Sequence, residues 1–216
     1  SVLGIRDSVF DAIGVVAGVL VPFAGLIFGP GVYAPYLVAC SFLFFLFCML
    51  RKRDLRDASI DVAYKTLALV YIAVPLSYLA FLSGLDNGRS WIIFLFLIIW
   101  ANDTFAYFAG RSFGRTRLLE SVSPKKTVEG AVAGLAGGVA AAMIFDHFAM
   151  LGMGLFLSGA VAVAAGFIGI IGDLAESLLK RGAGVKDSGT IIPGHGGVLD
   201  RIDSLIFPLP ALYYFI

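Results

Sequence analysis

The sequence predicts an all-α membrane protein, a polytopic bundle of about seven transmembrane helices with a polar site at one membrane face. Hydrophobic residues make up 59% of the 216 residues and charged residues only 14%, and the mean hydropathy is +0.93. These are too few polar side chains to cover a water-soluble globule of this size. The charged residues also gather in a few clusters, of which the stretch 177–203 is the richest. A membrane-embedded fold follows from this distribution.

Apolar runs that are long enough to cross a bilayer define the expected helices. A spanning helix needs about 20 mostly apolar residues. Seven runs meet this requirement: 8–29, 32–50, 60–83, 90–110, 127–146, 149–176 and 198–216. The sixth can continue through Arg181 as one long helix. Pro22 and Pro75 should kink their helices without ending them, because a helix cannot stop inside hydrocarbon.

Basic residues follow every second run and predict the orientation, because cytoplasmic loops are enriched in Lys and Arg. Those after the second, fourth and sixth runs are Arg51, Lys52, Arg53, Arg56; Arg111, Arg115, Arg117, Lys125, Lys126; and Lys180, Arg181, Lys186. In the sequence of the intervening loops, Arg89 is the only Lys or Arg. We therefore expect one integral-membrane domain over 1–216, with its first residues inside, its last outside and the basic loops in the cytoplasm.

Regularly spaced glycines predict close packing of the fifth and sixth runs. Gly130, Gly134 and Gly138 recur every fourth residue, and Gly166, Gly169 and Gly172 every third. Small residues at such spacings let helix backbones approach each other closely.

Asp103 is a carboxylate inside the fourth run, with Trp100 and Tyr107 at helical spacing from it. An intramembrane carboxylate is costly, so it indicates function by default. A structural hydrogen bond to a neighbouring helix and a site for a transported ion are the alternatives.

One face of the sixth run carries Asp173, Glu176, Ser177 and Lys180 in line. A simple i,i+4 ion pair would account for Glu176 and Lys180, whereas Asp173 can reach only Ser177 on its own helix. Asp200 and Asp203 begin the seventh run at the same end of the bundle. Carboxylates that converge from separate helices suit Mg²⁺. We expect Asp173 and Asp200 to hold the metal, with Glu176 and Asp203 as the nearest substitutes.

Two further features predict anion binding. Ser123 and Pro124 read as the cap and first turn of the fifth helix, whose N-terminus favours anions. Lys125 and Lys126 would clamp phosphates there, unless they are only topology signals.

A tight loop is expected at His195, Gly196 and Gly197, where exposed N–H groups can hold phosphate oxygens. A lone histidine is more often a structural hydrogen-bonding group than a metal ligand.

The pattern S-x-L-K-R-x4-K-D-x-G-x2-I-P-x-H-G-G-V-x-D-R-I-D over 177–203 resembles the full signature of the phosphatidate cytidylyltransferases, or CDP-diacylglycerol synthases. WANDTFAYFAGRSFG over 100–114, SPKKTVEG over 123–130 and GDLAES over 172–177 extend the resemblance. It covers about 57–216, the expected catalytic region, while the N-terminal helices of 1–56 match only in being apolar. Members of this family are usually longer at the N-terminus, so we expect that the natural start precedes Ser1.

The resemblance implies that CTP and phosphatidate give CDP-diacylglycerol and pyrophosphate, with Mg²⁺ required and K⁺ as a candidate second cation. The residues implied in catalysis are Asp173, Asp200, Lys180, Arg181 and Asp103. Those implied at CTP and its phosphates are Ser123, Lys125, Lys126, Lys186, Asp187, His195, Gly196, Gly197 and Arg201. The lipid phosphate is itself the nucleophile and is ionised near neutral pH. No protein nucleophile is needed, and His195 has no proton-transfer role.

The expected setting is the bacterial inner membrane, with the active site facing the cytoplasm and with CTP, phosphatidate and the bilayer as partners. The formal net charge of +1 gives no indication of a nucleic-acid partner. The sequence leaves open whether the chain forms a homodimer. Two other functions are open: a transporter using Asp103, Asp173 and Glu176 as an ion path, and a CTP-dependent polyprenol kinase. Analysis of the products separates the kinase from the cytidylyltransferase.

Overall fold

The computed structural model describes residues 8–50, 55–149, 151–189 and 197–216, and the chain divides into two compact units, Ser1–Phe81 and Leu82–Ile216. Among the described residues, six helical segments are long and apolar enough to cross a membrane. They are Ser8–Phe28, Pro30–Leu50, Arg56–Ser83, Gly88–Phe113, Val128–Ala149 and Gly154–Gly182. These segments confirm the first six predicted runs and the long sixth helix. The chain is an integral membrane protein with an α-helical fold.

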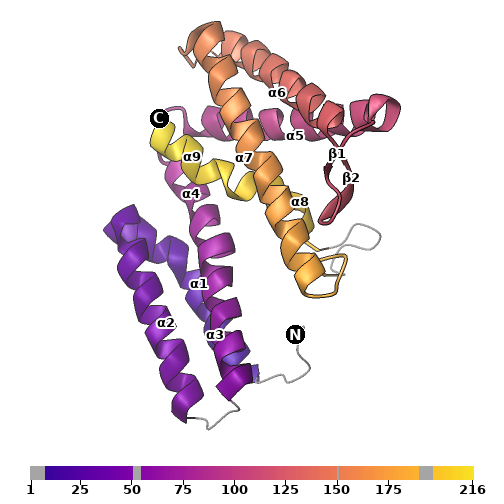
Figure 1. The fold of residues 1–216 in the computed structure, drawn as a ribbon. Coiled ribbons are helices and arrows are strands. Elements are labelled where there is room, and N and C mark those ends of the chain that lie inside the picture. Colours follow the sequence, from indigo (N-terminus) through magenta and orange to yellow (C-terminus); the bar gives the residue numbers. More distant parts are fainter. Residues whose placement is uncertain (1–7, 51–54, 150, 190–196) are drawn as a thin grey trace. The chain divides into compact units, whose positions relative to one another are not determined.

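The first unit contains the N-terminal helices (Figure 1). Its elements are α1 (Ser8–Phe28), the 3-10 turn η1 (Pro30–Val32), α2 (Tyr33–Leu50), α3 (Leu55–Ala68), the π-turn η2 (Leu69–Ala73) and most of α4 (Val74–Ser83). Phe10 of α1 packs edge-on against Phe44 of α2, with ring centroids 5.8 Å apart. Lys65 of α3 forms an ion pair with Asp11 of α1 at 2.9 Å. Apolar packing and this ion pair therefore join the three helices.

Neither internal proline ends its helical segment, as predicted. Pro22 lies inside α1. Before Pro75 the backbone widens into η2, where the amide of Val74 donates to the carbonyl of Leu69, five residues earlier. A π-turn of this kind adjusts the hydrogen-bond ladder next to a residue that has no N–H. The segment Arg56–Ser83 consequently stays long enough to span.

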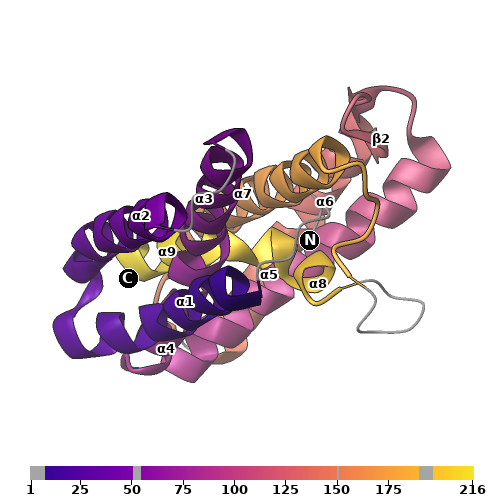
Figure 2. The same ribbon diagram turned by 90° about the horizontal axis from the view of Figure 1, so that it is seen from below.

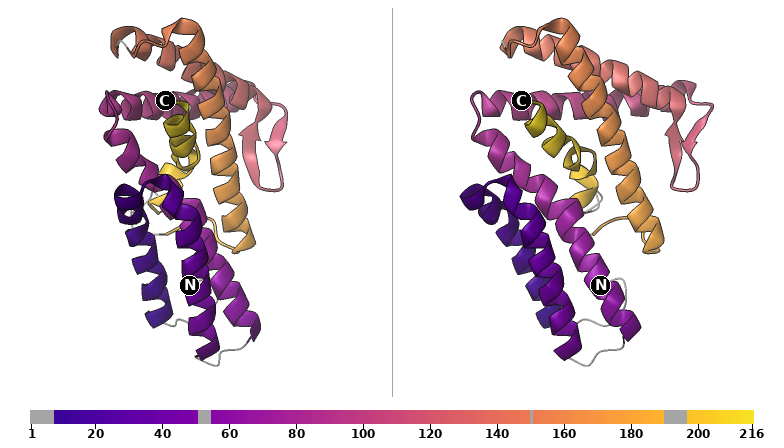
Figure 3. Two further views of the ribbon diagram at one scale, coloured as in Figure 1. Left: turned by 90° about the vertical axis from the view of Figure 1, so that its left-hand side faces the viewer. Right: turned by 60° about the vertical axis from the view of Figure 1, so that its left-hand side comes forward.

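The second unit is built around α5 (Gly88–Phe113), α6 (Val128–Ala149) and α7 (Gly154–Gly182), with α6 antiparallel to α5 and α7 packed against α6 (Figures 1 and 3). The predicted glycine faces form these contacts. A Cβ on Gly130 would meet the Ala106 carbonyl of α5, and a Cβ on Gly166 would meet Leu135 of α6. Backbones can come this close only where the side chain is a hydrogen atom.

The seventh predicted helix, 198–216, differs in the structure. It forms two short helices, α8 (Leu199–Ile206) and α9 (Pro208–Phe215), of eight residues each. Pro208 has no N–H to donate to the preceding turn, which interrupts the ladder. Eight residues rise only about 12 Å, so neither helix alone crosses a hydrocarbon core of about 30 Å. Figure 2 shows α8 beside α5 and α7, both of which it contacts.

Candidate functional site

A β-hairpin stands where the sequence predicted the start of the fifth helix. Its strands are β1 (Arg117–Leu119) and β2 (Ser123–Thr127), paired antiparallel, and α6 begins only at Val128. Ser123 and Pro124 therefore lie in a strand, and the expected cap at Ser123 is wrong. The Thr127 hydroxyl takes that role, because it accepts a hydrogen bond of 3.2 Å from the Gly130 amide.

Glu129 fixes the segment that leads into the first strand of the hairpin. The carboxylate of Glu129 accepts hydrogen bonds of 3.1 Å from the backbone amides of Arg115 and Thr116. The Thr116 carbonyl in turn accepts from the amide of Val128 at 2.9 Å. The turn after α5 is thus tied to the start of α6, and the hairpin lysines are carried by a strand instead of by a helix N-terminus.

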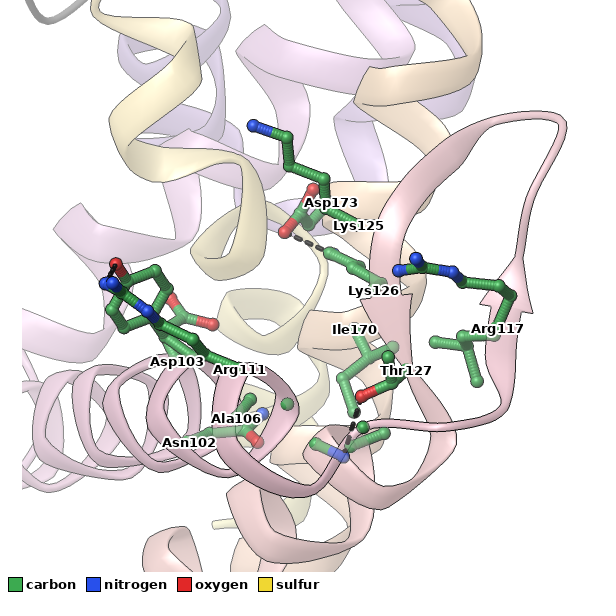
Figure 4. A pocket seen from close by; sticks show the side chains of 16 residues that line it. Asn102, Asp103, Ala106, Arg111, Arg117, Lys125, Lys126, Thr127, Ile170 and Asp173 are labelled. Carbon is green, nitrogen blue, oxygen red and sulfur yellow. Dashed lines mark hydrogen bonds and ion pairs between the residues drawn. The ribbon is translucent and has the colours of Figure 1, made fainter.

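A cavity of about 650 Å³ lies between α5, the hairpin, α6 and α7. Four basic side chains line it: Arg111, Arg117, Lys125 and Lys126. Asp103 and Asp173 contribute carboxylates to the same wall, and Figure 4 shows Asp103 coming from α5 and Asp173 from α7. The fold therefore gathers predicted site residues from three distant parts of the sequence.

Within this cavity Lys126 forms an ion pair with Asp173, whose side chains are 28% and 25% exposed (Figure 4). Ser177 donates a hydrogen bond of 3.4 Å to the other oxygen of Asp173, as expected from their spacing on α7. Asp103 and Asp203 lie near enough for their negative charges to interact repulsively with that of Asp173. Lys126, Asp103 and Asp173 therefore line the cavity together, while Asp203 of α8 is near Asp173 without lining the cavity.

Lys180 and Asp200 form a second polar cluster, between α7 and α8. The Lys180 ammonium lies 2.6 Å from a carboxylate oxygen of Glu176 and 2.6 Å from one of Asp200. The other oxygen of Asp200 accepts from the Ser188 amide at 2.9 Å, the Ser188 hydroxyl at 2.7 Å and the Gly197 amide at 2.7 Å. Burial opposes ionisation of Asp200, but these hydrogen bonds outweigh it and hold its pKa well below the usual range.

The structure thus groups the predicted metal carboxylates differently from the sequence. Asp173 is bonded to Lys126, whereas Asp200 is bonded to Lys180 and to the Ser188 and Gly197 backbone. Asp203 is the carboxylate of α8 that interacts with Asp173. Spacing alone could not show which of the two aspartates on α8 approaches Asp173, since both lie on its first two turns.

Glu176 is a buried carboxylate beside Asp203. Its side chain is 1% exposed, and its Oε1 has no hydrogen-bond partner among the described residues. The carboxylates of Glu176 and Asp203 lie next to each other. Burial, followed by repulsion from Asp173, raises the pKa of Asp203. This region is therefore short of positive charge.

The donor set fits a hard divalent cation. Within the described ranges, no three His, Cys, Asp or Glu side chains converge closely enough to form a full metal shell. Mg²⁺ does not need one, because it commonly binds one or two carboxylates and completes its shell with water and phosphate oxygens. The repulsion among Asp103, Asp173 and Asp203 is the observation that a bound cation would relieve.

Other predicted site residues lie away from the cavity wall. Arg181 ends α7 together with Gly182, and Lys186 and Asp187 follow in an exposed loop. Arg201 is exposed on α8, and Ser123 is half-buried in β2 without lining the cavity. His195 and Gly196 lie outside the described residues, so the predicted phosphate loop stays a prediction.

Arg111 and Arg117 were predicted only as topology signals, and both line the cavity. Asn102, for which no role was predicted, donates through its amide to the Gly166 carbonyl at 3.2 Å and joins α5 to α7. The available signal was position: Asn102 adjoins Asp103, and Arg111 follows Tyr107 by one helical turn. A basic residue on the same helix as an intramembrane carboxylate can therefore indicate a functional site as well as the topology.

Known proteins resemble this chain over most of its length. The model of the cytidylyltransferase family matches residues 4–216. A phosphatidate cytidylyltransferase of Staphylococcus epidermidis is 39% identical over 176 residues, which is 82% of this chain and 66% of that protein. The Bacillus subtilis phosphatidate cytidylyltransferase is 41% identical over 155 residues, 71% of this chain and 58% of that protein.

The chain thus spans just under two thirds of the S. epidermidis relative, at 66% of its length. The match of the family model extends through the N-terminal helices, which the motifs alone did not cover. On this match, the chain belongs to the cytidylyltransferase family.

Proposed function

We propose that this chain transfers the cytidylyl group of CTP to phosphatidate, giving CDP-diacylglycerol and pyrophosphate. The observation that carries the proposal is the cavity of about 650 Å³, in which four basic side chains and two carboxylates meet beside apolar helices. Its relatives in S. epidermidis and B. subtilis bear the name of this activity. A site of this kind suits the union of a polyphosphate with a membrane lipid.

The basic residues are proposed to neutralise and align two anions. CTP and phosphatidate repel each other, so bringing their phosphates together requires fixed positive charge. Arg111, Arg117 and Lys125 line the cavity, and among the described residues none of them forms an ion pair with a carboxylate. Lys126 is oriented by Asp173. The apolar helices would keep the acyl chains in the bilayer while the headgroup reaches this cavity.

The reaction needs no nucleophile from the protein. An oxygen of the phosphatidate phosphate attacks the α-phosphorus of CTP and forms a new P–O bond. The bond from the α-phosphorus to the oxygen bridging to the β-phosphorus breaks, and pyrophosphate leaves with that electron pair. The chain's residues hold both phosphates in line and stabilise the charge that develops on the leaving group.

Mg²⁺, with K⁺ as a candidate second cation, would supply additional positive charge to the phosphates. Asp173 and Asp203 are the ligands we propose, with Asp103 and Glu176 close to them. Asp200, the partner expected from the sequence, would act first through Lys180 and Ser188, to which its oxygens are bonded. Its direct participation in metal binding stays a prediction.

The proposed setting is the bacterial inner membrane, with the cavity open to cytoplasmic CTP. Basic residues that follow α5 line the cavity, and the basic residues at the end of α7 belong to the helix that carries Asp173. Association into a homodimer also stays a prediction.

The test is product analysis with the purified chain in detergent micelles that contain phosphatidate. CTP labelled at the α-phosphate should give labelled lipid, and CTP labelled at the γ-phosphate should give labelled pyrophosphate. Both products should disappear when Mg²⁺ is chelated and return when it is added back. Transfer of the γ-label to lipid would identify a kinase, and absence of any lipid product would refute the proposal.

A further inference from the structure

We infer that Arg111 and Tyr107 of α5 bind the phosphate of the lipid substrate, while Arg117 and Lys125 of the hairpin bind the phosphates of CTP. The inference rests on the proposed function and assigns its two substrates to different parts of one cavity. All four side chains line that cavity. What separates them is the element that carries them and the hydrogen bonding on α5.

Arg111 and Tyr107 lie where a membrane helix ends. Arg111 is two residues from the end of the apolar segment Gly88–Phe113. Its neighbours on the helix are strongly exposed, with Phe108 at 63% and Phe113 at 74%. Exposed aromatic rings next to a cation at a helix end are typical of the headgroup level of a bilayer. A lipid phosphate would meet Arg111 without leaving that level.

Arg117 and Lys125 belong to a different environment. They lie on β1 and β2, and the hairpin falls between the apolar segments Gly88–Phe113 and Val128–Ala149. Because the hairpin is outside the segments that can cross the membrane, a water-soluble nucleotide can reach its side chains without entering the hydrocarbon. The terminal phosphates of CTP are therefore the anions within reach of these two cations.

The hydrogen bond between Arg111 and Tyr107 on α5 leaves further N–H and O–H donors of these two side chains available to a ligand. A guanidinium nitrogen of Arg111 donates to the Tyr107 hydroxyl at 3.2 Å. Since the hydroxyl accepts this bond, its own hydrogen remains available to donate. The remaining N–H groups of the guanidinium can bind two oxygens of one phosphate side by side. A phosphate monoester, whose phosphorus carries three terminal oxygens, can accept from both residues together.

Simple anchoring at the membrane interface would also place an arginine at this position. Anchoring alone does not explain why Arg111 lines the cavity and donates to a tyrosine that lines it too. The two roles predict different kinetics. An anchor affects insertion and stability, whereas a substrate ligand changes the KM for one substrate.

The experiment compares four variants: Arg111→Ala, Tyr107→Phe, Lys125→Ala and the matched control Arg115→Ala. Arg115 is an exposed arginine that does not line this cavity. Rates are measured against the mole fraction of phosphatidate in micelles at saturating CTP, and against CTP at saturating phosphatidate.

For Arg111→Ala we expect the KM for phosphatidate to rise about ten- to a hundredfold, the effect of losing a hydrogen bond to a charged group, with little change in the KM for CTP. Tyr107→Phe should raise the KM for phosphatidate about three- to tenfold, as for a neutral donor. Lys125→Ala should instead raise the KM for CTP. Arg115→Ala should leave both values near those of the unmodified chain.

A rise confined to the KM for CTP in Arg111→Ala, or an equal rise in both KM values, would overturn the assignment. Failure of the unmodified chain to form CDP-lipid would instead refute the proposed function. Arg111→Lys serves if the alanine variant does not fold, because it keeps the charge and loses the side-by-side donors. In Arg111→Lys, the rise in melting temperature on adding short-chain phosphatidate should be reduced, whereas the rise on adding CTP should be unchanged.

Discussion

Lys180 bonds two carboxylates at once, so its first role is to hold α7 and α8 together. It lies 2.6 Å from Glu176, whose side chain is 1% exposed, and 2.6 Å from Asp200, whose side chain is 12% exposed. Removing one partner of a buried ion pair leaves an uncompensated charge, which costs more than the pair contributes. The sequence suggested the i,i+4 pair, the family resemblance implied a catalytic role for Lys180, and the structure shows the pair.

Lys180→Met should therefore destabilise the protein. We expect a loss of about 2–3 kcal/mol, below the value for a fully buried pair because Lys180 and Asp200 retain some contact with solvent. Unfolding in detergent should show the loss, and Glu176→Gln combined with Lys180→Met should recover part of it. Lys186→Met, at an exposed lysine near the end of α7, is the control for stability. Equal stability of both single variants would show that the cluster contributes nothing.

Asp173 is the carboxylate that we propose most directly as a metal ligand. It lines the cavity, pairs with Lys126 and interacts with the charges of Asp103 and Asp203. Asp173→Asn keeps the shape and removes the charge, so turnover should fall about a thousandfold, equivalent to roughly 4 kcal/mol of transition-state stabilisation. Stabilisation of the fold by added Mg²⁺ should be lost at the same time.

Glu120→Gln is the matched control for this prediction, because Glu120 is exposed in the hairpin turn and does not line the cavity. Turnover and Mg²⁺-dependent melting are measured for both variants. A folded Asp173→Asn protein with nearly normal turnover would remove Asp173 from the metal site.

At the level of elements, apolar runs predicted seven helical segments, of which six are confirmed, and glycine spacing predicted the packing faces of the fifth and sixth. The hairpin was beyond such reasoning. By local preference, Ser123 and Pro124 suit a helix start as well as Thr127 does. The strand forms instead because residues 123–127 pair with β1, and Glu129 holds the segment that leads into β1. The division of 198–216 into α8 and α9 falls at Pro208. Apolar length alone did not predict it, because a proline inside a run can kink a helix without ending it, as Pro22 and Pro75 do.

The closeness of α5 and α6 can be tested at Gly134. A Cβ at this position would lie 2.7 Å from the Asn102 carbonyl oxygen and 3.0 Å from the Ala106 side chain. Gly134→Ala should therefore force the helices apart and destabilise the protein by about 1–3 kcal/mol, as overpacking does. Activity should fall as well, because Asn102 and Ala106 line the cavity.

Gly182→Ala is the matched control, since no atom of the described residues lies within 4 Å of the added Cβ. It should be neutral or slightly stabilising, because alanine reduces the freedom of the unfolded chain. Melting curves of the two variants are recorded in the same detergent, and equal melting temperatures would contradict the predicted effect of the close contact at Gly134.

For the whole molecule, the number of crossings fixes which loops share a side of the membrane. The segments Val128–Ala149 and Gly154–Gly182 both lie between Arg115 and Lys186. Two crossings return the chain to the side from which it left, so these two positions must face the same compartment. Asp86 precedes the segment Gly88–Phe113 and must face the opposite one. This relation is independent of how α8 and α9 meet the bilayer.

Single cysteines test this arrangement in a protein that lacks Cys40 and Cys48. Both native cysteines are buried, so their replacement by Ala removes background labelling without exposing new surface. With a reagent that cannot cross membranes, Arg115→Cys and Lys186→Cys should react only in inside-out vesicles, and Asp86→Cys only in right-side-out vesicles. All three positions are exposed in the structure.

Each alternative outcome has a distinct meaning. Labelling of positions 115 and 186 from opposite sides would show that α6 and α7 do not both cross, which would contradict the fold. Labelling of both from outside would leave the six spans intact. It would, however, place the basic end of the cavity away from cytoplasmic CTP, and the proposed reaction could not take place there. The cytoplasmic result is expected because Lys and Arg cluster after α5 and α7 and are nearly absent from the alternate loops.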